Sequence, residues 1–128
     1  MKHTGKLTIQ VLAMPADTNP NGDVFGGWIL SQMDIAGGVF CRKVAHGRVV
    51  TVAMNSIEFN QPVFIGDTLS CYVELIKIGT TSMTVKIEAC AHRAEIKNSE
   101  NKVTEGIFTY VKIDENRKPT PIKKKQLV

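Results

Sequence analysis

One carboxylate inside an apolar segment is the residue of this sequence best placed to do chemistry. Asp34 stands between Met33 and Ile35, and three small residues follow, Ala36, Gly37 and Gly38. An aspartate on a mostly buried helix costs free energy unless it is paired or used. We therefore predict that Asp34 takes part in a reaction as a base or a nucleophile. The alternative is a structural role, in which Asp34 caps a segment or pairs with a group across a subunit interface.

The loop before this carboxylate offers hydrogen-bond donors. It contains Asn19, followed by Pro20, and it ends in the pair Gly26 and Gly27. The Asn19 amide can polarise a carbonyl group or orient a water, although an asparagine before a proline is also an ordinary turn residue. Backbone N–H groups in the first turn of a helix lack helical partners and suit a negatively charged oxygen. Gly26 and Gly27 are therefore candidates for an oxyanion site, the alternative being a simple bend.

A single long helix, from about Phe25 to about Ala45, must position these groups. Strong turn signals precede it, basic residues fill its last turn, and Gly47 follows as a natural C-terminal cap. Apolar residues wrap most of the way round, so we expect the helix to be buried on nearly all sides. Gly37 and Gly38 each weaken a helix by about 1 kcal/mol, which predicts close packing against them.

Most of the remaining sequence alternates between apolar and polar residues, the pattern of β-strands. Five strands are expected around positions 7–11, 49–57, 69–78, 83–89 and 103–113. One strand, one helix and four further strands indicate an α+β fold. A single apolar helix needs a broad sheet to enclose it. We therefore predict an antiparallel five-stranded sheet wrapped around one long central helix, which is the hotdog fold.

Length and composition predict one globular domain over residues 1–128, with a basic tail from about residue 115. The chain is 43% hydrophobic and 22% charged, and no apolar run is long enough to cross a bilayer. The first residues contain no secretion signal. We expect a cytoplasmic protein without a membrane partner. Three widely spaced cysteines, Cys41, Cys71 and Cys90, are expected to be buried and reduced rather than part of disulfides or a metal site.

The net charge of +4 comes mainly from the tail, whose cations are Arg117, Lys118, Lys123, Lys124 and Lys125. A solvated tail is the simplest interpretation of these charges. A phosphate-rich ligand such as a coenzyme is the second. Nucleic acid is the third, and we predict no nucleic-acid partner because no recognition motif accompanies the charge.

Several motifs in a fixed order resemble a known family. Positions 19–27 read NPNGDVFGG, 33–37 read MDIAG and 45–52 read AHGRVVTV; Pro62-Val63, Gly66-Asp67 and the GTTS of 79–82 follow. Together they resemble the acyl-CoA thioesterases of the hotdog superfamily, especially the short single-domain bacterial (YciA-like) type. The resemblance extends over roughly residues 10–115. In one departure, Gln61 stands where relatives often carry a basic residue.

The resemblance implies an enzyme that hydrolyses acyl-CoA to a free fatty acid and coenzyme A, with no metal and no cofactor beyond the CoA of the substrate. It also implies that two hotdog units pair and that Asn19 and Asp34 act together from opposite units. The expected assembly is a homo-oligomer with a dimer as its minimal unit, and a hexamer built as a trimer of dimers. Asp34 would activate a water, or attack directly through a mixed anhydride.

Hydrogen-bond donors and cations are the groups expected to bind CoA. The turn formed by Gly79, Thr80, Thr81 and Ser82 presents hydroxyls and N–H groups that could meet phosphates or pantetheine. Arg48 and the tail lysines are candidate phosphate partners, although each is also an ordinary surface charge.

Two other functions are alternatives to hydrolysis. A dehydratase needs a histidine beside a carboxylate, and His3, His46 and His92 all lie away from the expected helix start. A non-catalytic acyl-CoA-binding or sensing module could share the fold, but it would not need Asp34.

Overall fold

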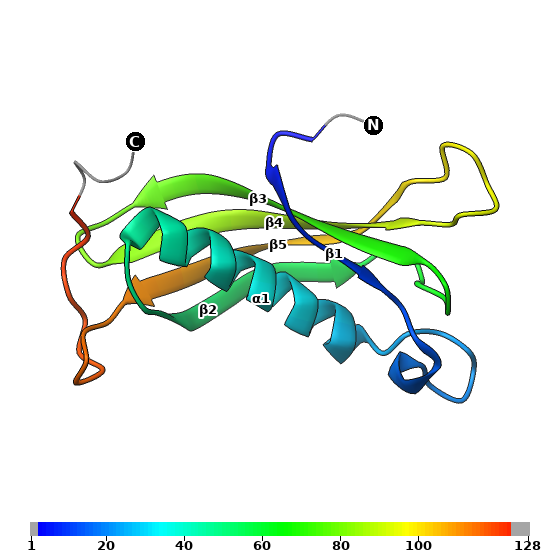
Figure 1. The fold of residues 1–128 in the computed structure, drawn as a ribbon, viewed down its shortest axis with the longest axis horizontal. Coiled ribbons are helices and arrows are strands. Elements are labelled where there is room, and N and C mark those ends of the chain that lie inside the picture. The colour runs from blue at the N-terminus through cyan, green and yellow to red at the C-terminus, as the bar shows by residue number, and fades with distance from the viewer. Residues whose placement is uncertain (1–2, 124–128) are drawn as a thin grey trace.

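The computed structural model describes residues 3–123. Its elements follow the predicted order: β1 (Lys6–Leu12), the short 3-10 helix η1 (Pro15–Asp17), α1 (Gly26–Ala45), β2 (Val49–Phe59), β3 (Thr68–Ile78), β4 (Ser82–His92) and β5 (Asn101–Lys112). The strands form one antiparallel sheet in the order β1-β3-β4-β5-β2. Figure 1 shows α1 lying along one face of this curved sheet. The predicted α+β hotdog fold is therefore confirmed.

The core lies between α1 and the sheet. Alternate residues of β4, namely Met83, Val85, Ile87 and Ala89, are fully buried, as the two-residue period predicted. The facing side of α1 supplies Ile29, Met33, Ala36 and Cys41. All three cysteines are buried and none forms a disulfide, which confirms that part of the expectation. Burial raises the pKa of each thiol to about 12, so the thiols stay protonated at neutral pH.

Two expectations about α1 are wrong in detail. Within the single chain the helix is buried on one side only, since Ile35 is 51% and Val39 37% exposed. The sheet covers only the face that it contacts, and nothing else in the described chain packs over the opposite side. The left-handed residue that ends the helix is His46 (φ 53°) rather than Gly47, and its backbone N–H donates to the carbonyl of Arg42.

Strand β2 forms an open edge of the sheet. It pairs with β5 on one side, and among residues 3–123 no strand lies next to it on the other. Val52 and Met54 on this strand are 55% and 38% exposed. An unpaired edge with apolar side chains is a ready surface for pairing with another strand.

The basic tail is only partly a solvated tail. Ile122 is buried, and its backbone N–H donates to the carbonyl of Thr80 in the β3–β4 turn. Packing of one apolar side chain thus ties the described part of the tail to the sheet. Lys124 and Lys125 lie outside the described residues. Within residues 3–123, no helix is both long and apolar enough to span a membrane.

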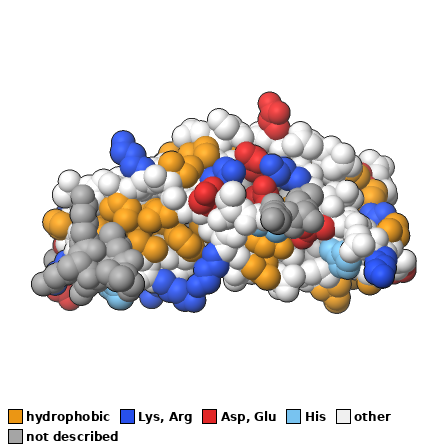
Figure 2. Space-filling model, turned by 90° about the horizontal axis from the view of Figure 1, so that it is seen from above, with side chains coloured by type: hydrophobic (Ala, Val, Ile, Leu, Met, Phe, Trp, Pro, Cys, Tyr) orange, Lys and Arg blue, Asp and Glu red, His pale blue; other side chains and the backbone are white. Residues whose placement is uncertain are grey.

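A cluster of ionisable side chains joins the N-terminal segment to the sheet. Figure 2 shows side chains of opposite charge side by side near the middle of one face, with an apolar area beside them. His3 contacts two carboxylates, with 2.5 Å from Nδ1 to Glu88 and 2.8 Å from Nε2 to Glu100. Its ring stacks on Tyr72 with centroids 3.6 Å apart, and Lys102 also pairs with Glu88. These contacts tie the residues before β1 to β3, β4 and β5.

Replacing His3 with glutamine is expected to lower the melting temperature by a few degrees, most strongly between about pH 4.5 and 6.5. Burial works against protonation, but the hydrogen bonds and charges of Glu88 and Glu100 outweigh it and raise the pKa of His3. Its contribution is therefore present at low pH and is lost as pH rises through the folded pKa. For Glu88, burial is likewise outweighed by His3 and Lys102, which lower its pKa, so that contribution is lost in acid.

Thermal unfolding across pH 4 to 9 measures this effect. The matched control is His92→Gln, which alters an exposed histidine. Its melting temperature should differ from that of the wild type by an amount that does not peak between about pH 4.5 and 6.5. If His3→Gln lowers the melting temperature equally at pH 5 and pH 9, the contribution of this cluster to stability does not have an ionic origin.

Candidate active site

The Asp34 carboxylate lies in the third turn of α1 and is held by two hydroxyl groups. Thr51 Oγ1 donates to Asp34 Oδ1 at 2.7 Å, and the Tyr110 hydroxyl donates to the same oxygen at 2.9 Å. The Tyr110 hydroxyl also lies 2.9 Å from the backbone carbonyl oxygen of Asp34. Asp34 itself is half-buried at the margin between α1 and β2. The carboxylate is thus anchored through one oxygen while the side chain stays within reach of solvent.

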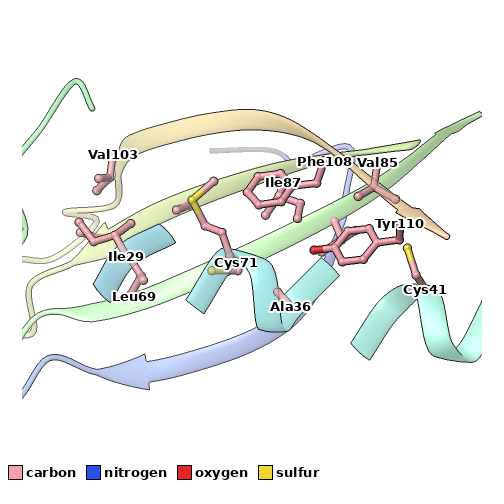
Figure 3. Close-up of a cluster of buried hydrophobic side chains, with 14 of the residues drawn as sticks. Ile29, Ala36, Cys41, Leu69, Cys71, Val85, Ile87, Val103, Phe108 and Tyr110 are labelled. Carbon is pink, nitrogen blue, oxygen red and sulfur yellow. The ribbon is translucent and has the colours of Figure 1, made fainter. Parts of the chain in front are cut away.

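Strand pairing explains why these two hydroxyls meet. Thr51 on β2 lies directly opposite Tyr110 on β5 in the antiparallel register. Figure 3 shows the Tyr110 ring on β5 with its hydroxyl directed toward the part of α1 that carries Ala36. The Tyr110 side chain is 1% exposed, and burial raises its pKa further above the usual range, aided by the charge of Asp34. The hydroxyl therefore keeps its proton and serves as a donor.

The small residues after Asp34 have separate explanations. A Cβ at Gly37 would lie 2.6 Å from Tyr110 Cζ and 2.7 Å from Ile87 Cδ1, so glycine is needed for the close approach. The predicted tight packing is confirmed there. At Gly38 a Cβ would meet nothing within 4 Å in this chain, so the same prediction is wrong for packing within one chain.

Asn19 holds its own loop in shape. Its side-chain Oδ1 accepts hydrogen bonds from the backbone N–H groups of Asn21 (2.9 Å) and Asp23 (3.2 Å). One short bridge, between Thr18 and Val24, closes this loop, and a second, between Asp23 and Phe64, attaches it to the body of the protein. Because Oδ1 is engaged with the loop, the amide nitrogen is the end of Asn19 suited to donate to a ligand.

The start of α1 borders a cavity. Phe25 is the N-cap residue and makes no side-chain cap, so the first helical N–H groups, at Gly26 and Gly27, have no side-chain partner from the cap. A cavity of about 280 Å³ adjoins this end of the helix. Its lining includes Asn19, Gly26, Ile29, Phe59, Gln61 and Val63. It combines apolar walls with a few polar groups, as ligand sites do.

The predicted site residues fall into three places within one chain. Asn19, Gly26 and Gly27 lie at the start of α1, and Asp34 lies about 12 Å farther along the helix, from its rise per residue. Arg48 and the 79–82 turn lie at the opposite end of the sheet. There the backbone carbonyls of Thr81 and Arg48 accept from the consecutive N–H groups of Lys112 and Ile113. One chain therefore does not bring Asn19 to Asp34, although it does bring the candidate CoA residues together.

Two residues of the site were not predicted from the sequence, Thr51 and Tyr110. Each sits in an alternating strand pattern, where it looks like an ordinary strand residue. Only the pairing of β2 with β5 and the packing of α1 place both hydroxyls on the carboxylate.

Comparison with known proteins gives a consistent result. The model of the thioesterase superfamily matches residues 21–96. The acyl-CoA thioester hydrolase YciA of Salmonella typhimurium is 47% identical over 120 residues, which cover 92% of this chain and 90% of that protein. YciA of Escherichia coli K12 is 46% identical over 117 residues, covering 90% of this chain and 89% of that protein.

Solved structures agree with the sequence relatives. HI0827, described as a hexameric broad specificity acyl-coenzyme A thioesterase, has a TM-score of 0.91 at 39% identity and covers 99% of this chain and 89% of its own. The hexameric thioesterase y2039 from Yersinia pestis has a TM-score of 0.90 at 43% identity, with 96% and 99% covered. On its sequence, its fold and these relatives, the chain belongs to the hotdog-fold acyl-CoA thioesterases of the thioesterase superfamily.

Proposed function

We propose that this protein hydrolyses acyl-CoA thioesters to a free fatty acid and coenzyme A, with Asp34 as the catalytic carboxylate. The observation that carries the proposal is the half-buried Asp34 side chain, fixed through Oδ1 by Thr51 and Tyr110. A carboxylate held in this way can act repeatedly in one geometry. The relatives named acyl-CoA thioester hydrolases supply the substrate class.

In the proposed reaction, Asp34 accepts a proton from a water as the water oxygen attacks the thioester carbonyl carbon. The tetrahedral oxyanion is stabilised by the Asn19 amide and by the N–H groups of Gly26 and Gly27. Collapse of this intermediate breaks the carbon–sulfur bond, and the proton held by Asp34 goes to the departing thiolate. The alternative uses the same carboxylate as a nucleophile, through a mixed anhydride that water then cleaves.

This chemistry requires two chains, because Asn19 and Asp34 are apart in one. Two β2 edges that pair antiparallel about a two-fold axis place the Val49 end of one strand beside the Phe59 end of the other. Phe59 lines the cavity that also contains Asn19, while Thr51, near the Val49 end, holds Asp34. Such pairing carries the partner's Asn19 toward Asp34. The exposed Val52 and Met54 of β2 support this interface.

The same pairing brings the cation-bearing end of one chain to the cavity of the other. Arg48 and the 79–82 turn are then positioned for the CoA phosphates, beside a cavity that suits the acyl or pantetheine chain. We propose a dimer as the catalytic unit and a hexamer as the full assembly, as described for HI0827 and y2039. The reaction as written uses no metal or prosthetic group, and the cytoplasm is the proposed location.

Release of CoA thiol from a panel of acyl-CoAs of increasing chain length tests this function. We expect turnover of several thioesters by the wild-type protein, with an equal amount of free acid. Binding of CoA without turnover of any thioester would replace this proposal by the non-catalytic acyl-CoA-binding module.

A further inference from the structure

We propose that Tyr110 is a positioning residue for this reaction: its buried hydroxyl fixes the Asp34 side chain so that Oδ2 faces the reacting groups. The inference rests on the proposed function and adds a residue that does not touch the substrate. Tyr110 lies in the sheet beneath α1, and it acts through Asp34 alone.

The contacts restrict the carboxylate in two ways. The Tyr110 hydroxyl lies 2.9 Å from both the backbone oxygen and the Oδ1 of Asp34, so one group links the side chain to its own backbone. Thr51 donates to the same Oδ1 from β2 at 2.7 Å. With both hydroxyls on Oδ1, rotation of the carboxylate is restricted, and Oδ2 is directed to the opposite side.

Room for this hydroxyl requires a glycine in α1, which lowers the stability of the helix. Gly37 lies one turn after Asp34, and a methyl group there would collide with the Tyr110 ring and with Ile87. Glycine is a poor residue for a helix interior, so its use here has a steric reason. A phenylalanine at 110 would fill the same core without a polar atom, as Phe108 does two residues earlier on β5. The hydroxyl is therefore present for its hydrogen bonds.

The groups that titrate around Asp34 are few among the described contacts. Tyr110 on β5 keeps its proton, and Cys41 on α1 is a neutral thiol because burial raises its pKa to about 12. Thr51 on β2 carries no charge. Removal of the Tyr110 hydroxyl therefore changes the hydrogen bonding of the carboxylate without changing a neighbouring charge.

The test compares wild-type protein with Tyr110→Phe. We expect kcat to fall about 10- to 100-fold while KM stays within about twofold, since the carboxylate is displaced but the substrate surface is unchanged. Phe108→Leu is the matched control, because it disturbs the same core and should leave kcat within about twofold of the wild-type value.

A second measurement needs no turnover. The Asp34 carboxyl resonance, assigned by its absence in Asp34→Asn, is compared by carbon-13 NMR at one neutral pH in wild type, Tyr110→Phe and Phe108→Leu. A changed chemical shift in Tyr110→Phe, and not in Phe108→Leu, supports the inference. An unchanged chemical shift overturns it, whatever the stability of the variant. Absence of hydrolysis in the wild type would instead overturn the proposed function, and the chemical shift would still decide the role of Tyr110.

Discussion

Replacing Asp34 with asparagine should lower the rate of acyl-CoA hydrolysis by at least about 10³-fold, because the amide can neither accept a proton at neutral pH nor attack a thioester. The substitution is nearly isosteric, and the amide oxygen can still accept the hydrogen bonds of Thr51 and Tyr110. We therefore expect the variant to fold and to keep its melting temperature within a few degrees. The measurement is release of CoA thiol, with CoA affinity followed by calorimetry.

The matched control for this substitution is Asp114→Asn. Asp114 accepts two backbone hydrogen bonds in an exposed turn far along the chain from α1, and its replacement should leave the rate unchanged. CoA affinity should stay within a few-fold of wild type in both variants. Hydrolysis by Asp34→Asn at the wild-type rate would show that Asp34 takes no part in the reaction. Another group of the protein would then have to be the catalytic one.

The sequence allowed the fold to be predicted because its local signals agree. Strict alternation along β4 marked a half-buried strand, and all four of the predicted inward residues are buried. The start of α1 followed from turn residues before Gly26. The burial of α1 could not be predicted from its composition, since apolar residues on the side away from the sheet remain exposed within one chain. Such residues have the same pattern whether they face a core or a partner.

The candidate site was predictable only in part. Asp34 could be selected because a carboxylate in an apolar helix is rare. Gly26 and Gly27 could be selected because the N–H groups at a helix start suit an oxyanion, whereas the role of Asn19 depended on the resemblance to a family. Thr51 and Tyr110 could not be selected, because their role depends on register between β2 and β5, which are about 60 residues apart in sequence. Gly37 gave a usable signal: a helix-weakening residue predicted a close neighbour, and the Tyr110 ring is that neighbour.

Mixing two inactive variants should restore activity if the site is shared between chains. Asn19→Asp is the suitable partner for Asp34→Asn, since aspartate keeps the acceptor for the N–H groups of Asn21 and Asp23 but loses the amide donor. Loss of one oxyanion donor is expected to lower the rate by about 10²- to 10³-fold. The loop should therefore stay folded while the variant alone is nearly inactive.

Each shared site needs Asp34 from one chain and Asn19 from the other. In an equal mixture of the two variants after subunit exchange, about one-quarter of the sites combine an intact Asp34 with an intact Asn19. The double variant mixed equally with wild type is the control. It should leave about one-quarter of wild-type activity for a shared site and about one-half for a site within one chain.

The complementation assay is the most direct test of a thioesterase site formed by Asp34 of one chain and Asn19 of its partner. It measures CoA release by the exchanged mixture of Asp34→Asn and Asn19→Asp against each variant alone. Recovery of about one-quarter of the wild-type rate is the predicted result. A mixture no more active than its separate components, in which exchange has been verified by mass spectrometry, would contradict the shared site.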